Sequence, residues 1–271
     1  MEFYKYEATA NDFIMLDRMS GGPGTPPETV RALCARHTGV GADGVIEMLP
    51  SDTSDLRMRI FNADGSEAQM CGNGVRALFL FALDLGVVDS DEITVETLAG
   101  VRRVRREGEL FAVDMGLPAW TRGAVPVAGA PDEEAIGIEI ALSAGERFKA
   151  TCVSMGNPHS VIFVDEVGSY PVEDVGKRIE TLECFPERTN VEFVKASGGA
   201  LEARVWERGV GETMACGTGA CAALVAASLN GLTGKSATVS LPGGSLEVEW
   251  REDAVVMTGP ARHVFDGKTV D

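Results

Sequence analysis

One phrase occurs twice in this chain, and it limits the possible folds more than any other feature. It reads Cys-Gly-Asn-Gly-Val-Arg-Ala from Cys71 and Cys-Gly-Thr-Gly-Ala-Cys-Ala from Cys216. Further residues precede the two cysteines at equal distances, Glu67 and Glu212 as well as Phe61 and Trp206, and Asn11 and Asn157 do so at nearly equal distances. Self-similarity of this extent indicates an internal duplication, so we expect two halves of similar design.

Each copy of the phrase opens a predicted helix, over about 72–85 and about 217–230. A glycine follows each segment, Gly86 and Gly231, at the position where helices commonly end. Both segments are apolar almost all round, so each helix should be enclosed by other structure and should not lie on a surface.

Most of the remaining chain consists of short β-branched or aromatic runs separated by Gly, Pro, Asn and Asp, which is typical of strands and turns. The predicted strands are 13–16, 56–61, 92–97, 110–115, 160–164, 190–194, 201–206, 237–241 and 254–257. Two further helices are predicted at 27–37, after a possible cap at Thr25, and at 172–183.

These patterns predict an α+β protein with two pseudo-symmetric halves, each a mixed β-sheet or barrel wrapped around a central apolar helix. The first half should comprise residues 1–117 and carry Cys71. The second should comprise residues 118–261 and carry Cys216. A C-terminal tail of about 262–271 is expected to return to the first half.

Charge and hydropathy exclude several classes of function. A net charge of −17 opposes nucleic-acid binding, and the arginines of 102–106 are interpreted as a solvated strand face. The N-terminus lacks a signal-peptide pattern, and the longest apolar run, 77–83, is too short to cross a bilayer. We therefore expect a cytoplasmic protein with a small-molecule substrate and with neither nucleic-acid nor membrane partners.

The six cysteines are too few for a disulfide framework in 271 residues, and in the cytosol they should be thiols. Zinc-like spacing of Cys and His is absent from the sequence, so no metal is expected. Four cysteines outside the repeated context are interpreted as packing residues: Cys34, Cys152, Cys184 and Cys221. For Cys71 and Cys216 the alternatives are a structural role, which the duplicated context disfavours, and a mutual disulfide, which the compartment disfavours.

The repeated phrase also predicts chemistry. A cysteine just before a helix start faces unpaired backbone N–H groups and the positive end of the helix dipole, which lower a thiol pKa. The same N–H groups bind anions such as a carboxylate, and the glycines allow close approach. Facing halves would present two thiols to opposite sides of one α-carbon, as stereochemical inversion requires, without an electron-sink cofactor.

Several phrases, taken together and in this order, resemble the diaminopimelate epimerase family over essentially the whole chain. Besides the two cysteine phrases they are Asn11-Asp-Phe, Gly41-Ala-Asp-Gly, Phe61-Asn-Ala-Asp-Gly-Ser-Glu, Gly156-Asn-Pro-His, Thr189-Asn-Val-Glu-Phe and Trp206-Glu-Arg-Gly. The resemblance implies interconversion of LL- and meso-diaminopimelate, toward lysine and peptidoglycan, without pyridoxal phosphate. It also implies a homodimer.

The resemblance assigns roles to individual residues. Cys71 and Cys216 correspond to the acid and base thiols, with His159 and Glu207 close to them. The residues expected to bind the reacting end of the substrate are Asn11, Gly72, Asn73, Asn157, Gly217 and Thr218. Those expected to bind its far carboxylate and second amine are Asn62, Asn190, Arg208 and Glu207.

Two departures from the family pattern fall in the first half. The chain has Ala8-Thr9-Ala10 where glycines are usual, and Gly44 where some members have glutamine. The alternatives in function are another racemase of the same fold, such as a histidine racemase, and a binding protein without catalysis. Asn62, Asn190 and Arg208 argue against histidine, which lacks a second amino-acid group, and the presence of both cysteines argues against a non-catalytic role.

Overall fold

The computed structural model describes residues 1–142 and 145–270, and the chain divides into two compact units. One unit is Met1–Asp114 with Thr258–Asp271, and the other is Met115–Met257. The expected limits of 117, 118, 261 and 262 differ from these by three to four residues. The second crossing falls inside strand β17, Val255–Pro260, where no turn residue marks it.

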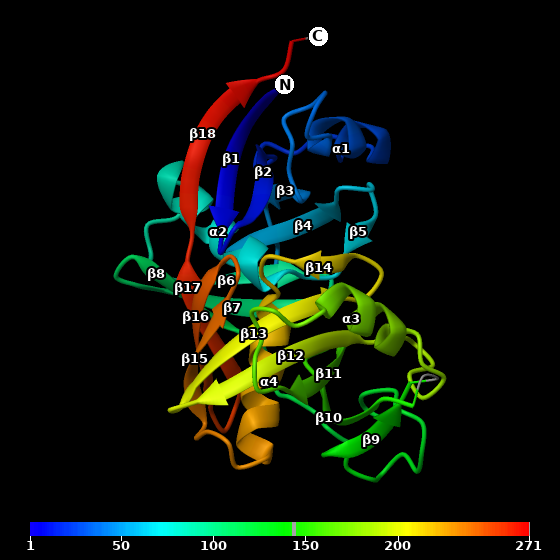
Figure 1. Ribbon diagram of the computed structural model, residues 1–271. Helices are drawn as coiled ribbons and strands as arrows, with labels where there is room; N and C mark the ends of the chain where they lie inside the picture. The colour runs from blue at the N-terminus through cyan, green and yellow to red at the C-terminus, as the bar shows by residue number, and fades with distance from the viewer. Residues whose placement is uncertain (143–144, 271) are drawn as a thin grey trace. The chain divides into compact units, whose positions relative to one another are not determined.

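The first unit contains two helices among its strands. Its elements are β1 (Glu2–Ala8), β2 (Asn11–Asp17), α1 (Pro27–Cys34), β3 (Gly44–Leu49), β4 (Leu56–Asn62), β5 (Glu67–Ala68), α2 (Gly72–Asp84), β6 (Glu92–Thr97), β7 (Gly100–Glu107), β8 (Leu110–Asp114) and, after the second unit, β18 (Arg262–Lys268). Strand β2 pairs antiparallel with β1 and parallel with β3, and β4 pairs antiparallel with β3 and parallel with β6. Strand β18 pairs antiparallel with β1, as Figure 1 shows in red and blue.

The second unit repeats this order of elements. They are β9 (Ile138–Ala141), β10 (Arg147–Ser154), β11 (Pro158–Phe163), α3 (Val172–Glu180), β12 (Asn190–Ser197), β13 (Ala200–Glu207), β14 (Gly211–Thr213), α4 (Gly217–Leu229), β15 (Ser236–Leu241), β16 (Gly244–Trp250) and β17. Strand β11 pairs antiparallel with β10 and parallel with β12, and β13 pairs antiparallel with β12 and parallel with β15. Strand β9 takes the place beside β10 that β18 takes beside β1.

The two apolar helices are the core of their units, as the sequence predicts. Nearly every residue of α2 from Gly72 to Ala82 is buried, and so is α4 from Gly217 to Ala227, except at Leu80 and Thr218. Each helix is followed by a glycine with positive φ, Gly86 at 67° and Gly231 at 69°. The α+β class and the central apolar helices are therefore confirmed.

The predictions for the other two helices were correct in place but wrong in detail. Helix α1 ends at Cys34, before 37, and α3 ends at Glu180, before 183. Thr25 does not cap α1, because its N–H and its hydroxyl both donate to Glu47 Oε1 at 2.7 Å. Pro26 occupies the cap position without a side-chain hydrogen bond. Thr25 therefore donates to a buried carboxylate instead of capping the helix.

Three of the four arginines of β7 pair with carboxylates at the surface. Arg106 lies 2.8 Å from Asp91, and Arg105 lies 3.1 Å from Glu107. Such pairs are consistent with the predicted solvated face. Within residues 1–142 and 145–270, none of the helices has both the length and the apolar character that spanning a membrane demands.

The turn between β1 and β2 consists of two residues that lack the glycines usual there. Thr9 has φ of 54° and Ala10 has φ of 59°, as a type I′ hairpin turn requires. This conformation costs residues with a Cβ about 1–2 kcal/mol. Thr9 contributes a contact that glycine could not make, because its hydroxyl accepts a hydrogen bond from the buried Arg76 Nη2 at 3.0 Å.

Replacing Ala10 by glycine should stabilise the protein. Relief of the left-handed conformation outweighs the added flexibility of the unfolded chain by about 0.5–1 kcal/mol in the free energy of unfolding. Urea denaturation of the Ala10→Gly variant measures this. Thr9→Gly is the matched control, because it relaxes the same turn but removes the acceptor of Arg76 and should be destabilising. A lower stability for Ala10→Gly would contradict the interpretation.

Candidate functional site

Cys71 is the N-cap residue of α2, and its sulphur belongs to a small hydrogen-bonded cluster. Cys71 Sγ accepts a hydrogen bond from the N–H of Gly74 at 3.4 Å and lies 3.7 Å from Asn11 Oδ1. Asn73 Nδ2 donates to the same Asn11 oxygen at 3.4 Å. The thiol is half-buried. By helix geometry the N–H groups of Gly72 and Asn73 have no intrahelical acceptor, so they remain able to bind an anion.

The fully buried Arg76 holds this cluster in place through hydrogen bonds. Arg76 Nη2 donates to Asn73 Oδ1 at 2.6 Å and to the hydroxyl of Thr9 at 3.0 Å. The first turn of α2 is thereby tied to the hairpin that carries Asn11. This role could not be predicted from the sequence, because an arginine within an apolar helix has no local signal for its partners.

Cys216 has the same position at the start of α4. Its sulphur accepts a hydrogen bond from the N–H of Gly219 at 3.4 Å and lies 3.5 Å from the hydroxyl of Thr218. Asn157 Nδ2 donates to that hydroxyl oxygen at 3.3 Å. The structure thus brings Asn157 and Thr218 to Cys216 much as it brings Asn11 and Asn73 to Cys71. Cys216 is more enclosed, with 7% of its surface exposed.

Acidic groups surround Cys216 and change the expected electrostatics. Burial raises the pKa of the Cys216 thiol well above its ordinary value, and the nearby carboxylates of Glu207 and Glu192 raise this pKa further. The hydrogen bonds from Thr218 and Gly219 oppose these effects but do not outweigh them. The hydrogen bond from the helix start does lower the pKa of Cys216, as expected, but it is not the dominant effect on this thiol. Loss of solvation exceeds the effect of the helix terminus.

Glu207 lies directly beside this thiol. Its carboxylate accepts a hydrogen bond from the Thr213 hydroxyl at 2.5 Å and also hydrogen-bonds with Cys216. Burial raises the pKa of Glu207, while these hydrogen bonds act in the opposite direction.

His159 and Glu192 form a buried pair in the same unit. His159 Nδ1 lies 2.6 Å from Glu192 Oε1, and its Nε2 lies 3.0 Å from Asn157 Oδ1. Neither side chain is exposed to solvent, and burial raises the pKa of Glu192. The sequence analysis assigned His159 to the site but not Glu192. The available signal was a glutamate inside the apolar run of β12.

Two of the residues predicted to bind the far end of the substrate, Asn190 and Arg208, are hydrogen-bonded to each other in the second unit. Asn190 Oδ1 accepts a hydrogen bond from the backbone N–H of Arg208 at 2.8 Å, and Asn190 Nδ2 donates to the carbonyl of Pro158. Arg208 Nη1 donates to the carbonyl of Glu187 at 3.0 Å. Asn62 lies at the end of β4 in the first unit, where it donates to Ser66 at 3.0 Å.

The departure at Gly44 has a steric cause. A Cβ at this position would lie 2.5 Å from the carbonyl oxygen of Phe61. Strands β3 and β4 therefore approach too closely for glutamine at this register. A side chain at position 44 would require the two strands to move apart.

The remaining cysteines lie in the cores of the units or beside them. Cys34, Cys152 and Cys221 are buried and Cys184 is half-buried. Burial raises the pKa of Cys34 to about 11 and that of Cys152 to about 12. Among residues 1–142 and 145–270, no three His, Cys, Asp or Glu side chains are grouped so that they could hold a metal ion.

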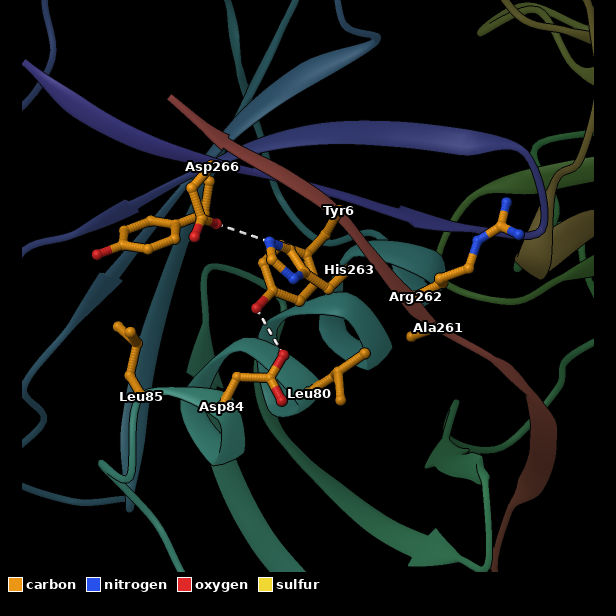
Figure 2. A pocket seen from close by; sticks show the side chains of 9 residues that line it. Tyr6, Leu80, Asp84, Leu85, Ala261, Arg262, His263 and Asp266 are labelled. Atoms are coloured by element: carbon orange, nitrogen blue, oxygen red, sulfur yellow. Dashed lines mark hydrogen bonds and ion pairs between the residues drawn. The ribbon is translucent and has the colours of Figure 1, made fainter. Parts of the chain in front are cut away.

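A hollow of about 590 Å³ in the first unit is separate from the Cys71 cluster. In Figure 2, Tyr6 donates to Asp84 at 2.6 Å, and His263 is bonded to Asp266 at 2.6 Å. Asp84 is the last residue of α2, whereas Cys71 precedes the first. The 13 residues of this helix separate the two places by about 20 Å.

Comparison with known proteins identifies a matching family model, relatives that are similar in sequence and a solved structure that is similar in fold. Residues 3–121 and 151–264 match the family model described as diaminopimelate epimerase. "Diaminopimelate epimerase 1" of Nostoc sp. is 48% identical over 99% of both chains, and the Synechococcus sp. JA-2-3B'a(2-13) enzyme "Diaminopimelate epimerase" is 50% identical over 99% and 98%. A probable proline racemase structure from Agrobacterium radiobacter has a TM-score of 0.72 at 16% identity, covering 99% and 92%.

Alkylation should distinguish Cys71 from the core cysteines. At pH 8, pKa values of about 11 and about 12 leave roughly one thiolate in 10³ for Cys34 and one in 10⁴ for Cys152, and both are buried. Iodoacetamide should therefore modify the half-buried Cys71 before either of them, as read by peptide mass spectrometry. Unfolded protein, in which all cysteines react alike, is the control. Equal rates for Cys152 and Cys71 in folded protein would contradict the prediction.

Proposed function

Because the chain belongs to the diaminopimelate epimerase family, we propose that it interconverts LL- and meso-2,6-diaminopimelate by inverting one α-carbon. It is an isomerase, and this reaction lies on the route to lysine and to peptidoglycan. The observation that carries the proposal is the duplicated helix start. In each unit a cysteine sulphur accepts the N–H of the third helical residue, beside two further N–H groups that can bind a carboxylate.

Inversion at an α-carbon needs a base on one face and an acid on the other. We assign these roles to Cys71 and Cys216. One sulphur, as thiolate, takes the α-proton and becomes a thiol, and the other thiol gives its proton to the opposite face and becomes a thiolate. The reverse reaction exchanges the roles. No net proton is gained or lost, and each turnover leaves the two thiols in exchanged protonation states.

The carboxylate at the reacting carbon receives the electron pair left by the α-proton. Its negative charge is stabilised by N–H groups already in place, those of Gly72, Asn73, Gly217 and Thr218. Asn11 and Asn157 would orient this end, since each is hydrogen-bonded within the cluster of its own cysteine. This assignment requires no cofactor to hold the charge.

The far end of the substrate would be selected by charge and geometry. Arg208 can bind a carboxylate with two parallel hydrogen bonds, and Asn190 fixes its backbone. Asn62 would add a donor. Glu207 was expected to meet the second ammonium, but its carboxylate is bonded to Thr213 beside Cys216, so we assign it to the reacting end. A histidine substrate lacks this second head group, so these residues favour diaminopimelate.

We also propose a cytoplasmic location and a homodimer. The dimer is implied by the family resemblance. Val264 and Phe265 on β18 are exposed apolar side chains of a kind that a subunit interface covers.

Deuterium incorporation tests the proposed reaction. Reduced, folded protein incubated with LL-diaminopimelate in D₂O should give meso product with deuterium at the inverted carbon, because the donating thiol exchanges with solvent. The other α-carbon should keep its hydrogen. Mass spectrometry and NMR measure both. An absence of exchange would refute the proposed function.

Cysteine variants test the two-thiol assignment. Cys71→Ala and Cys216→Ala should each lower kcat for epimerisation by at least about 10²–10⁴, the contribution of a positioned acid or base. Cys34→Ala is the control, because Cys34 lies in the apolar core. Racemisation assays in both directions measure the effect. An active Cys216→Ala variant would overturn the assignment.

Loss of the distal arginine should weaken binding more than chemistry. Arg208→Ala removes charged hydrogen bonds worth about 1.5–3 kcal/mol, so KM should rise roughly 10- to 100-fold with a smaller effect on kcat. Steady-state kinetics separates the two constants. Arg204→Ala is the control of equal charge, because Arg204 is bonded to Glu212 on the neighbouring strand. A loss confined to kcat would contradict the assigned role.

A further inference from the structure

The duplication allows the surroundings of the two thiols to be compared position by position. Asn11 corresponds to Asn157, so Phe13 on β2 corresponds to His159 on β11. The parallel register of each pair of strands then equates Ile46 on β3 with Glu192 on β12. Ile46 and Glu192 also lie at equivalent places beneath the first turns of α2 and α4. Each of them closely approaches a glycine of its helix.

The two glycines are the third residues of the helices. A Cβ on Gly74 would lie 2.9 Å from Ile46 Cδ1, and a Cβ on Gly219 would lie 3.0 Å from Glu192 Oε1. The side chains beneath each helix start form a cradle for its first turn. The cradle of the first unit is apolar, and that of the second contains a carboxylate. The backbones match, but the chemistry beneath the thiols differs.

Stability alone does not require the ionisable pair. Removing a histidine and a glutamate from water is costly, and apolar residues of similar volume often serve as well or better. The first unit demonstrates this solution with Phe13 and Ile46, both buried. Among the described residues, Glu192 Oε2 has no hydrogen-bond partner, so half of the buried carboxyl group is uncompensated.

The pair is connected to Cys216 by an unbroken chain of hydrogen bonds. Glu192 Oε1 lies 2.6 Å from His159 Nδ1, and His159 Nε2 lies 3.0 Å from Asn157 Oδ1. Asn157 Nδ2 donates to Thr218 at 3.3 Å, and the Thr218 hydroxyl is 3.5 Å from the sulphur. The donors of Asn157 Nδ2 and of the Thr218 hydroxyl can both point toward Cys216, so the Thr218 hydroxyl stabilises its thiolate.

We propose that Glu192 is a positioning residue for Cys216, which through His159, Asn157 and Thr218 sets the proton affinity of this thiol and not that of Cys71. The inference rests on the proposed two-thiol function. Glu192 determines which nitrogen of His159 carries the proton, and its own charge opposes the thiolate. Glu207 on β13 also faces Cys216 and is the other acidic group that acts on it.

The Glu192→Gln variant tests this directly by alkylation. Glutamine keeps the shape and a hydrogen bond to His159 but cannot ionise, so the Cys216 thiolate loses a neighbouring negative charge. The iodoacetamide rate of Cys216 at pH 8 should rise roughly three- to tenfold, and its pH profile should move to lower pH by roughly one unit. The rate of Cys71, measured in the same digest, should change less than about twofold.

Glu47→Gln is the matched control. Glu47 is equally buried, and it lies on β3 beside Ile46, but it is bonded to Thr25 and paired with Arg59. This variant should leave the alkylation profiles of both catalytic thiols unchanged. If Glu192→Gln fails to fold, the double variant His159→Phe with Glu192→Ile carries the same test, because it copies the apolar cradle of the first unit. It too should shift the Cys216 profile and spare Cys71.

Thiol titration does not depend on catalysis, so it separates this inference from the proposed function. Wild-type protein that fails to exchange deuterium refutes the function, whatever the alkylation shows. If wild type is active, Glu192→Gln should also shift the pH profile of kcat while KM changes less than about threefold. An unchanged Cys216 profile in folded Glu192→Gln protein, or an equal shift at Cys71, overturns the role of Glu192.

Discussion

The structure depends on a hydrogen bond from a helix start to sulphur, made once in each unit. The N–H groups of Gly74 and Gly219 donate to Cys71 and Cys216, each at 3.4 Å. This contact requires the cysteine to be in extended conformation before the helix and a third helical residue without a side chain. It also requires a helix whose first turn is held firmly, which is why α2 and α4 are enclosed by the sheets of their units.

Much of this could be predicted from the sequence because its signals are local. The repeated cysteine phrases, the apolar runs and the terminal glycines determined α2 and α4 to within one residue at their C-terminal ends. Strands such as Glu92–Thr97 and Asn190–Ser197 were also found, since they alternate or are continuously apolar. The site residues near each cysteine occur in recognisable phrases.

Other features depend on contacts between distant residues, and the sequence did not reveal them. The bond of Arg76 to Thr9 spans 67 positions, and that of His159 to Glu192 spans 33. Thr25 lies where a helix cap is expected, but a buried carboxylate competes for its hydrogen bonds. The expectation for the pKa of Cys216 left out burial and two carboxylates for the same reason. The residues next to Cys216 show that a helix starts there. They do not show that the thiol is buried or that two carboxylates approach it.

The two units show how a duplicated fold can diverge without losing its backbone. Their strands pair in the same order and sense, yet one thiol rests above apolar side chains and the other above a charged network. Identical cradles would give both sulphurs the same electrostatic surroundings. Divergence beneath the helix start gives each sulphur its own surroundings while the N–H groups that we propose as the carboxylate site keep their positions.

The return of β18 to β1 has a consequence for the order in which the units form during synthesis. The second unit is continuous in the chain, so its last residue, Met257, is translated before the strand that completes the first unit. The first unit must wait for Arg262–Lys268, and the amino terminus is then held by Thr269 at 2.8 Å. The half that is translated first is therefore the half that is finished last.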